Sequence, residues 1–160
     1  MLDYTLVTTK ATYRPITPVD VPGFIHLVTK YYTEELSLPP VPPEQILATI
    51  RELDRHKNEG SVLVFEKDEC LVGYCILMNR WSPARGGTAL DIDELYVVPQ
   101  QQEQGIAADF VSLLLKVAPK DCAVIRWEVR RGNKKSLALS RKLGFRDTGR
   151  TIVTADVEHE

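Results

Sequence analysis

The sequence contains only three cysteines, and they lack the spacing of a metal site. Cys70, Cys75 and Cys122 include no CxxC pair, so neither a zinc site nor a dense disulfide framework is expected. The odd count favours a reducing compartment, and we expect a cytoplasmic protein without a metal cofactor. Cys75 and Cys122 lie in apolar runs, where we expect inert buried thiols.

The sequence also has no excess of one charge and no long apolar run. A net charge of -2 gives no electrostatic reason to expect nucleic acid or an anionic membrane as a partner. No stretch is long enough to span a bilayer, and residues 1–10 do not resemble a secretory signal. The 160 residues show no internal repeat, and we expect one domain over residues 1–160.

The most informative stretch predicts a strand, a turn and a helix in succession. Ala89–Val98 is rich in branched and aromatic residues, and Pro99 ends this strand. A polar turn leads to Gly105, which permits an unusual backbone dihedral or a close approach. A helix begins at Ile106 and ends before Pro119. Its apolar face consists of Ile106, Phe110, Leu113, Leu114 and Val117.

This arrangement provides a potential anion site. The first N–H groups of a helix lack internal partners and lie at the positive end of its dipole, so a pyrophosphate would fit there. An ordinary turn between a strand and a helix explains the pattern equally well.

Two motifs resemble signatures of the GCN5-related N-acetyltransferase (GNAT) superfamily. The first is similar to the acetyl-CoA signature Arg/Gln-x-x-Gly-x-Gly/Ala and reads Gln102-x-x-Gly105-x-Ala107. The second is similar to the family pattern Asn-x-x-Ala-x-x-Leu-Tyr-x-x-x-Gly-Phe and reads Asn133-x-x-Ser136-x-x-Leu139-Ser140-x-x-x-Gly144-Phe145.

The resemblance implies that acetyl-CoA is the co-substrate. Leu95, Tyr96 and Val97 would contact pantetheine beside a strand bulge, which we expect near Glu94–Tyr96, and Asn133 would contact the cofactor arm. Ser140 is a further expected cofactor contact. The residues expected to hold the pyrophosphate are Gln102, Glu103, Gln104, Gly105, Ile106, Ala107 and Ala108.

Three carboxylates in the central strand could accept a proton from an amine. Deprotonating an alkylamine at pH 7 costs about 4–5 kcal/mol, which a positioned carboxylate can offset. By the resemblance we favour Asp93 as the base, then Glu94, then Asp91. Alternatively, these carboxylates solvate the strand edge or pair with Arg80 or Arg85.

Ser140 departs from the family pattern. Many relatives carry a tyrosine there, thought to protonate the leaving thiolate, and a serine hydroxyl is a poor acid. Releasing a free thiolate at pH 7 costs about 2 kcal/mol, which water or another side chain could offset. The departure weakens the assignment of proton transfer more than that of cofactor binding.

The remaining sequence predicts the order β-α-α-β-β-β-α-β-α-β. The fold class is α/β (α+β), with a mixed, mostly antiparallel central sheet of six to seven strands flanked by about four helices, as in the GNAT fold. Asp20 can cap the first helix and Asn133 the last, with Gly144 as its stop. Gly73 marks a bulge or a close backbone contact, and residues 80–87 are expected to form a loop. The other expected strands are Thr8–Ile16, Ser61–Phe65, Leu71–Met78, Cys122–Val129 and Phe145–Val157.

The junction of the first two helices helps to wall the acceptor site in the superfamily. Tyr31, Tyr32, Glu34 and Glu35 are therefore candidate substrate contacts, and an acidic patch would suit a cationic amine. Alternatively, they form a half-buried tyrosine pair and an acidic helix end.

Three hypotheses follow. The first is acetyl transfer from acetyl-CoA to a primary amine, on a small molecule or a protein, by direct attack, since no cysteine stands beside a clear histidine base. The second is a non-catalytic CoA-binding sensor or interaction domain. The third is a structural α/β domain that CoA does not stabilise. A homodimer is possible by the resemblance.

Overall fold

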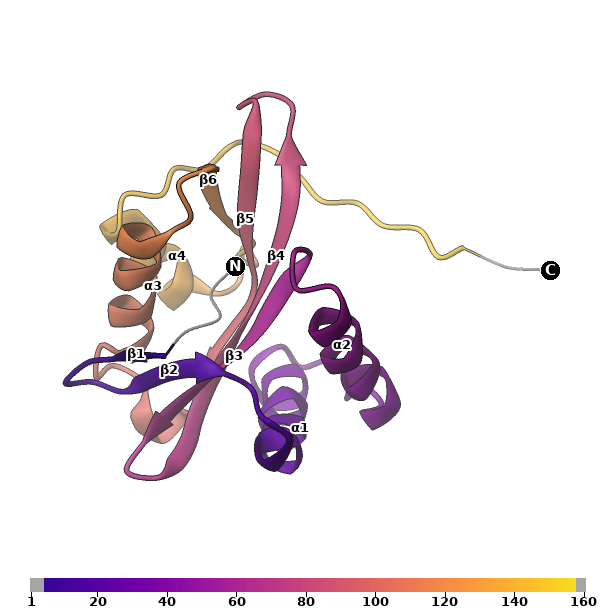
Figure 1. The fold of residues 1–160 in the computed structure, drawn as a ribbon, viewed down its shortest axis with the longest axis vertical. Coiled ribbons are helices and arrows are strands. Elements are labelled where there is room, and N and C mark those ends of the chain that lie inside the picture. Colours follow the sequence, from indigo (N-terminus) through magenta and orange to yellow (C-terminus); the bar gives the residue numbers. More distant parts are fainter. Residues whose placement is uncertain (1–4, 158–160) are drawn as a thin grey trace.

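The protein folds around one mixed sheet in the computed structural model, which describes residues 5–157 (Figure 1). The strands lie in the order β1-β2-β3-β4-β5-β6. All neighbours are antiparallel except β5 and β6, which are parallel. The expected mixed, mostly antiparallel sheet is therefore confirmed. The strands are β1 Leu6–Val7, β2 Thr12–Pro15, β3 Gly60–Lys67, β4 Cys70–Ser82, β5 Gly87–Val97 and β6 Cys122–Trp127.

Helices cover both faces of the sheet (Figure 1). Helices α1 (Val21–Lys30) and α2 (Pro43–Arg55) lie on one side, and α3 (Ile106–Val117) and α4 (Lys134–Lys142) lie on the other. The apolar faces of α1, α2 and α3 pack against the sheet, as helical spacing predicted for α3. Their fully or nearly buried members are Phe24, Leu27, Val28, Ile46, Leu53, Ile106, Phe110 and Leu114.

The predicted first strand, Thr8–Ile16, is only partly right: β2 occupies Thr12–Pro15, but the chain turns back before it. The Thr8 backbone N–H and side-chain hydroxyl both donate to the Ala11 carbonyl. The Thr8 hydroxyl also accepts from the Lys10 N–H. A threonine side chain that replaces strand partners in this way favours a turn over a continuous strand. The result is a short hairpin in which Leu6 pairs with Tyr13.

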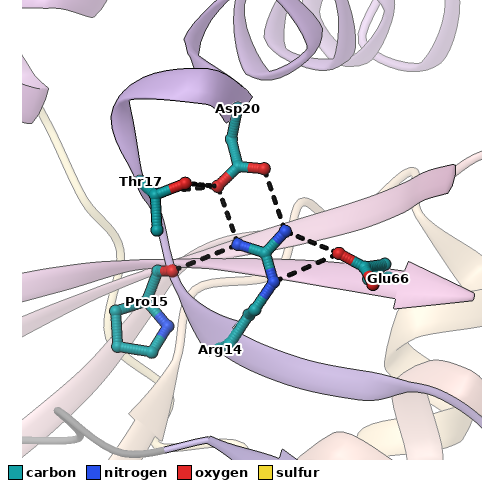
Figure 2. A network of polar contacts seen from close by, with 5 residues as sticks. All are labelled: Arg14, Pro15, Thr17, Asp20 and Glu66. Carbon is teal, nitrogen blue, oxygen red and sulfur yellow. Dashed lines mark hydrogen bonds and ion pairs between the residues drawn. The ribbon is translucent and has the colours of Figure 1, made fainter. Parts of the chain in front are cut away.

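The sequence suggested that Asp20 could cap α1 with its side chain, but Asp20 does not do so. It accepts from the Thr17 backbone N–H, which closes the short 3-10 turn Pro18–Asp20 instead. Figure 2 shows the Arg14 guanidinium between Asp20 and Glu66. Two hydrogen bonds from Arg14, of 2.7 and 2.9 Å, lower the pKa of the buried Asp20 carboxyl to about 2. This network fixes the entry of α1 to strands β2 and β3.

The loop predicted over residues 80–87 is shorter than expected. Strand β4 continues to Ser82, and Trp81 pairs with Thr88 of β5. The turn is confined to residues 83–86, where Pro83 lacks an N–H and Gly86 adopts a φ of 63°. The residues before that turn remain free to pair across the hairpin.

The strand predicted over Phe145–Val157 is wrong, and the sheet has six strands. Gly144, with a φ of 89°, ends α4 as predicted, but the following chain runs away from the body as a tail (Figure 1). Ile152, Val153 and Val157 are 64%, 87% and 76% exposed. Their β-forming side chains specify a strand only where a neighbouring strand accepts them, and none does so here.

Candidate functional site

The site begins at a bulge in the central strand β5. Ile76 of β4 pairs with Glu94, whereas the next residue, Leu77, pairs with Ile92. Asp93 therefore has no partner across the ladder and is the extra residue of the bulge. We expected the bulge near Glu94–Tyr96, so it lies at least one residue earlier than predicted. It re-aims the side chains on either side of it.

Beyond the bulge, β5 and β6 separate and a cleft opens between them. Their pairing ends at Ile92 and Trp127, and the cleft that follows has a volume of about 1240 Å³. Strand β5, the turn before α3, the loop before α4 and the π-helical turn Tyr31–Glu35 contribute to its walls. The predicted site residues that line it are Glu34, Glu35, Leu95, Tyr96, Val97, Gln102, Glu103, Gly105, Ile106, Ala107, Ala108 and Asn133. The predicted contact Gln104 does not line it.

Strands β4 and β5 approach each other closely beside this cleft. A methyl group added at Gly73 of β4 would lie 2.3 Å from the Tyr96 carbonyl oxygen. Gly73 therefore marks a close backbone contact, as the sequence suggested. The ladder between β3 and β4 also shifts register at the neighbouring Phe65.

The N-terminus of α3 opens into the cleft. Gly105 precedes the helix with a φ of 83°, and no side chain caps the end. The first intrahelical bond of this end is donated by Asp109 to the Gly105 carbonyl, which leaves the amides of Ile106, Ala107 and Ala108 without helical partners. Gln102 holds the turn in place by donating to the Val97 carbonyl at 2.8 Å. An anion such as a diphosphate suits these amides.

Basic side chains around the cleft were missed in the sequence. They come from the loop before α4 and from α4 itself: Arg130, Arg131, Lys134, Lys135 and Lys142. Lys135 lies 3.4 Å from Glu103 and so faces the turn before α3. The signal was present as two basic pairs on either side of Gly132 and Asn133, but the sequence indicated only a turn there. These cations favour a polyanionic ligand.

Asn133 holds the start of α4, as predicted. Its side-chain oxygen accepts from the Ser136 backbone N–H at 3.0 Å. Its amide nitrogen also reaches Glu35 across the cleft at 3.4 Å. Burial raises the pKa of the Glu35 carboxyl, while the hydrogen bond from Asn133 opposes that shift.

Asp91 is engaged in ion pairs. The Arg126 guanidinium makes two bonds to it, of 2.6 and 2.8 Å, and Arg80 lies at 3.0 Å. Asp91 is 7% exposed and does not line the cleft. Of the two pairing partners suggested from the sequence, Arg80 fills that role, and Arg126 was not anticipated.

Glu94 and Asp93 have different surroundings. Glu94 lies among tyrosines: one carboxylate oxygen accepts from Tyr32 and the other from Tyr74, both at 2.7 Å. Burial raises the pKa of Glu94, and the two tyrosine hydrogen bonds oppose that shift. Asp93 is exposed at the bulge and, among residues 5–157, has no hydrogen-bond or ion-pair partner. Partial burial of its carboxyl raises its pKa.

The remaining predicted residues lie outside the cleft. Ser140 is 8% exposed, and its hydroxyl donates to the Leu137 carbonyl at 2.9 Å. Tyr31 packs edge-on against Tyr32 with ring centroids 5.5 Å apart, so the tyrosine pair is at least in part structural. Tyr32 lines a separate cavity together with Glu94. Within residues 5–157 there is no cluster of three or more potential metal ligands, and none of the helices is long and apolar enough to cross a membrane.

Comparisons with known proteins find similar acetyltransferases. Thialysine N-epsilon-acetyltransferase of Sus scrofa is 32% identical over 82 residues, which cover 49% of this chain and 46% of that protein. The chain therefore matches about half the length of this curated relative.

Solved structures share the fold at low sequence identity. A possible acetyltransferase from Clostridium difficile 630 has a TM-score of 0.78 and 16% identity over 92% of this chain and 97% of that one. AAC(6')-Iy, solved with a CoA-containing bisubstrate analogue, has a TM-score of 0.75 and 15% identity over 91% of this chain and 97% of that one.

The family model described as the acetyltransferase (GNAT) family matches residues 23–145. This range includes the bulged strand, the turn before α3 and the Asn133 motif. The chain belongs to the GNAT acetyltransferase family.

Proposed function

We propose that the protein transfers an acetyl group from acetyl-CoA to a primary amine by direct attack in a ternary complex. The observation that carries the proposal is the separation of β5 from β6 beside the uncapped end of α3, with the unpartnered Asp93 at the bulge. Family membership and the similarity to thialysine N-epsilon-acetyltransferase support it.

The cleft fits the two ends of CoA. The free amides at Ile106–Ala108 and the basic residues around them suit the phosphates. The unpaired edge of β5 at Leu95–Val97 suits the pantetheine amides, which need backbone partners. When bound, acetyl-CoA supplies the thioester carbonyl that the amine attacks.

The reaction needs a neutral amine. An ammonium group bound at the site first loses one proton, which we assign to the Asp93 carboxylate, directly or through water. The amine nitrogen then forms a bond to the carbonyl carbon, and the bond from carbon to sulfur breaks. The amide nitrogen loses its second proton, the departing thiolate takes up one, and the net products are an acetamide, CoA and one proton.

Asp93 suits the role of base better than its neighbours. Asp91 is neutralised by two arginines, and Glu94 is held by two tyrosines. The raised pKa of Asp93 is closer to neutral pH than the ordinary value for an aspartate. A carboxylate with a higher pKa accepts a proton more favourably. We give Ser140 a structural role, because its hydroxyl is directed at a backbone carbonyl.

The test compares Asp93→Asn with the wild type in thiol release from acetyl-CoA, using a panel of primary amines. We expect the variant to lose about 10²-fold or more in kcat/KM, while CoA affinity by calorimetry stays unchanged. Asp54→Asn, an exposed change on α2, is the matched control. Undiminished turnover by Asp93→Asn would remove Asp93 as the base.

A second function has one observation in its favour. The Ser140 hydroxyl donates to the Leu137 carbonyl, so this position supplies no acid for the departing thiolate. A CoA-binding sensor or interaction domain would need no such acid. It predicts tight CoA binding by the wild type without turnover of any amine in the panel. A purely structural domain would show neither CoA binding nor thermal stabilisation.

A further inference from the structure

A second cavity lies on the face of the sheet covered by α1 and α2. Its volume is about 360 Å³, which is at the lower end of the range for small-molecule pockets. Five of its nine lining residues are apolar and come from the two helices, the segment before α2 and strand β4: Phe24, Val28, Val41, Ile46 and Ile76. Gln45 and Thr49 of α2, together with Tyr32 and Glu94, supply its polar groups.

Glu94 is the only carboxylic acid in this lining, and no Lys, Arg or His accompanies it there. Each carboxylate oxygen accepts one tyrosine hydroxyl, which leaves further lone pairs available. Among residues 5–157, no Lys, Arg or His forms an ion pair with Glu94. A half-buried carboxylate beside apolar walls is stabilised most by a cation that carries an apolar chain, because the chain can pack against those walls.

The cavity and the main cleft are lined by adjacent residues of β5. Glu94 lines the cavity, and the next residue, Leu95, lines the cleft. The turn Tyr31–Glu35 has the same division, because Tyr32 lines the cavity while Glu34 and Glu35 line the cleft. A nitrogen held by Glu94 would thus lie beside the bulge at Asp93.

We propose that this cavity binds the carbon chain of the amine acceptor, which is a primary monoamine with an apolar chain and its ammonium group against Glu94. This inference rests on the acetyl transfer proposed above. Glu94 is the one carboxylate in the lining, and the rest of the walls offer no charge to pair with a second ammonium group, so amines with a distal ammonium group are poor acceptors. Glu94 is thereby assigned to binding the ammonium group, and Asp93 to accepting its proton.

Substrate length and charge provide the first test. For straight-chain monoamines from propylamine to hexylamine, kcat/KM should rise roughly fourfold per added methylene, as expected for burial in an apolar cavity. Hexylamine should exceed 1,6-diaminohexane and spermidine by about tenfold or more. Equal or better use of the diamine or spermidine would overturn the proposal.

A variant at the rim provides the second test. Gln45 is exposed on α2 and lines the cavity, so Gln45→Glu adds a carboxylate without disturbing the core. We expect it to raise the ratio of diamine to monoamine kcat/KM about tenfold. Ala48→Glu adds the same charge on α2 outside the cavity lining and should leave the ratio unchanged. The same shift in both variants, or in neither, would count against the cavity.

Direct binding separates this inference from the proposed function. Calorimetry of hexylamine with the protein–CoA complex should show binding that Glu94→Gln weakens about tenfold, while CoA affinity is retained. If no amine is acetylated but hexylamine still binds in this Glu94-dependent manner, acetyl transfer fails and the amine site stands. If amines are acetylated but hexylamine binding is independent of Glu94, the site assignment fails alone.

Discussion

Three carboxylates within four residues of β5 have three different environments. Asp91 pairs with two arginines, Glu94 accepts from two tyrosines, and Asp93 has no partner among the described residues. The bulge causes the difference, because it inserts Asp93 between two residues that would otherwise follow the strand's alternation. Side chains of the same chemical type therefore have separate surroundings, which is why we propose separate roles for them in structure, binding and proton transfer.

The environment of Glu94 has a consequence for stability against pH. Its pKa is raised in the folded protein by burial, so the folded state favours the protonated form relative to the unfolded chain. The contribution of Glu94 to stability is thus present below about pH 4.5 and is lost as the pH rises through the folded pKa. We expect the free energy of unfolding of Glu94→Gln, relative to the wild type, to increase as the pH rises from about 4.5 toward about 7.

Urea denaturation of both proteins across this pH range measures the effect. Glu44→Gln, an exposed change on α2, is the matched control. A constant difference between Glu94→Gln and the wild type would contradict the prediction, since it would mean that the Glu94 carboxyl titrates alike in the folded and unfolded chains.

Asp20 gives the opposite pH dependence. Its pKa falls from 3.8 to about 2 because Arg14 hydrogen-bonds to it, so its contribution is present above 3.8 and is lost as the pH falls toward 2. Asp20→Asn should cost about 1–3 kcal/mol at neutral pH, because it leaves Arg14 partly unpaired. Denaturant titrations should show the deficit shrinking below pH 3.8. A deficit that persists unchanged at the lowest pH would instead indicate a packing defect.

At the scale of elements, the uncapped end of α3 directly follows a left-handed glycine. Gly105 has a φ of 83°, and an added methyl would meet Lys10 only at ordinary contact distance, 3.7 Å. The cost of Gly105→Ala is therefore conformational, about 1–2 kcal/mol in the free energy of unfolding. We also expect weaker CoA binding by calorimetry, since the substitution disfavours the conformation that presents the amides.

Gly132→Ala is the matched control for this change. Gly132 also borders the cleft, but its φ is not in the left-handed region, and an added methyl would meet nothing within 4 Å. It should leave the free energy of unfolding within about 0.5 kcal/mol of the wild type. A loss of similar size in both variants would show that the conformation of Gly105 is not what matters.

At the scale of the whole molecule, the tail after α4 is separate from the core. Residues 146–157 are exposed and form no helix or strand. Because proteases cut exposed chain that lacks secondary structure, trypsin should cleave after Arg146 or Arg150 well before it cuts the helices and strands. Mass spectrometry of a digestion time course would identify the first cuts. Protection of these bonds in the intact protein would show that the tail pairs with another surface in solution.

The sequence alone determined most elements of the fold and the position of the turn before α3. Helical spacing identified the buried face of α3, because burial of an apolar stripe depends mainly on local periodicity. Pro99, Gly105 and Asn133 marked element boundaries, since each has a conformational or capping preference that acts within a few residues.

Only the tertiary structure decided the partners of these residues. The bulge at Asp93 is set by register against β4, and the partners of Asp91 and Glu94 come from residues far along the chain, such as Arg126 and Tyr32. The tail has the composition of a strand, yet strand formation requires a neighbour that local sequence does not supply. Periodicity and capping act over a few residues, whereas register, ion pairing and cavities depend on which distant segments meet.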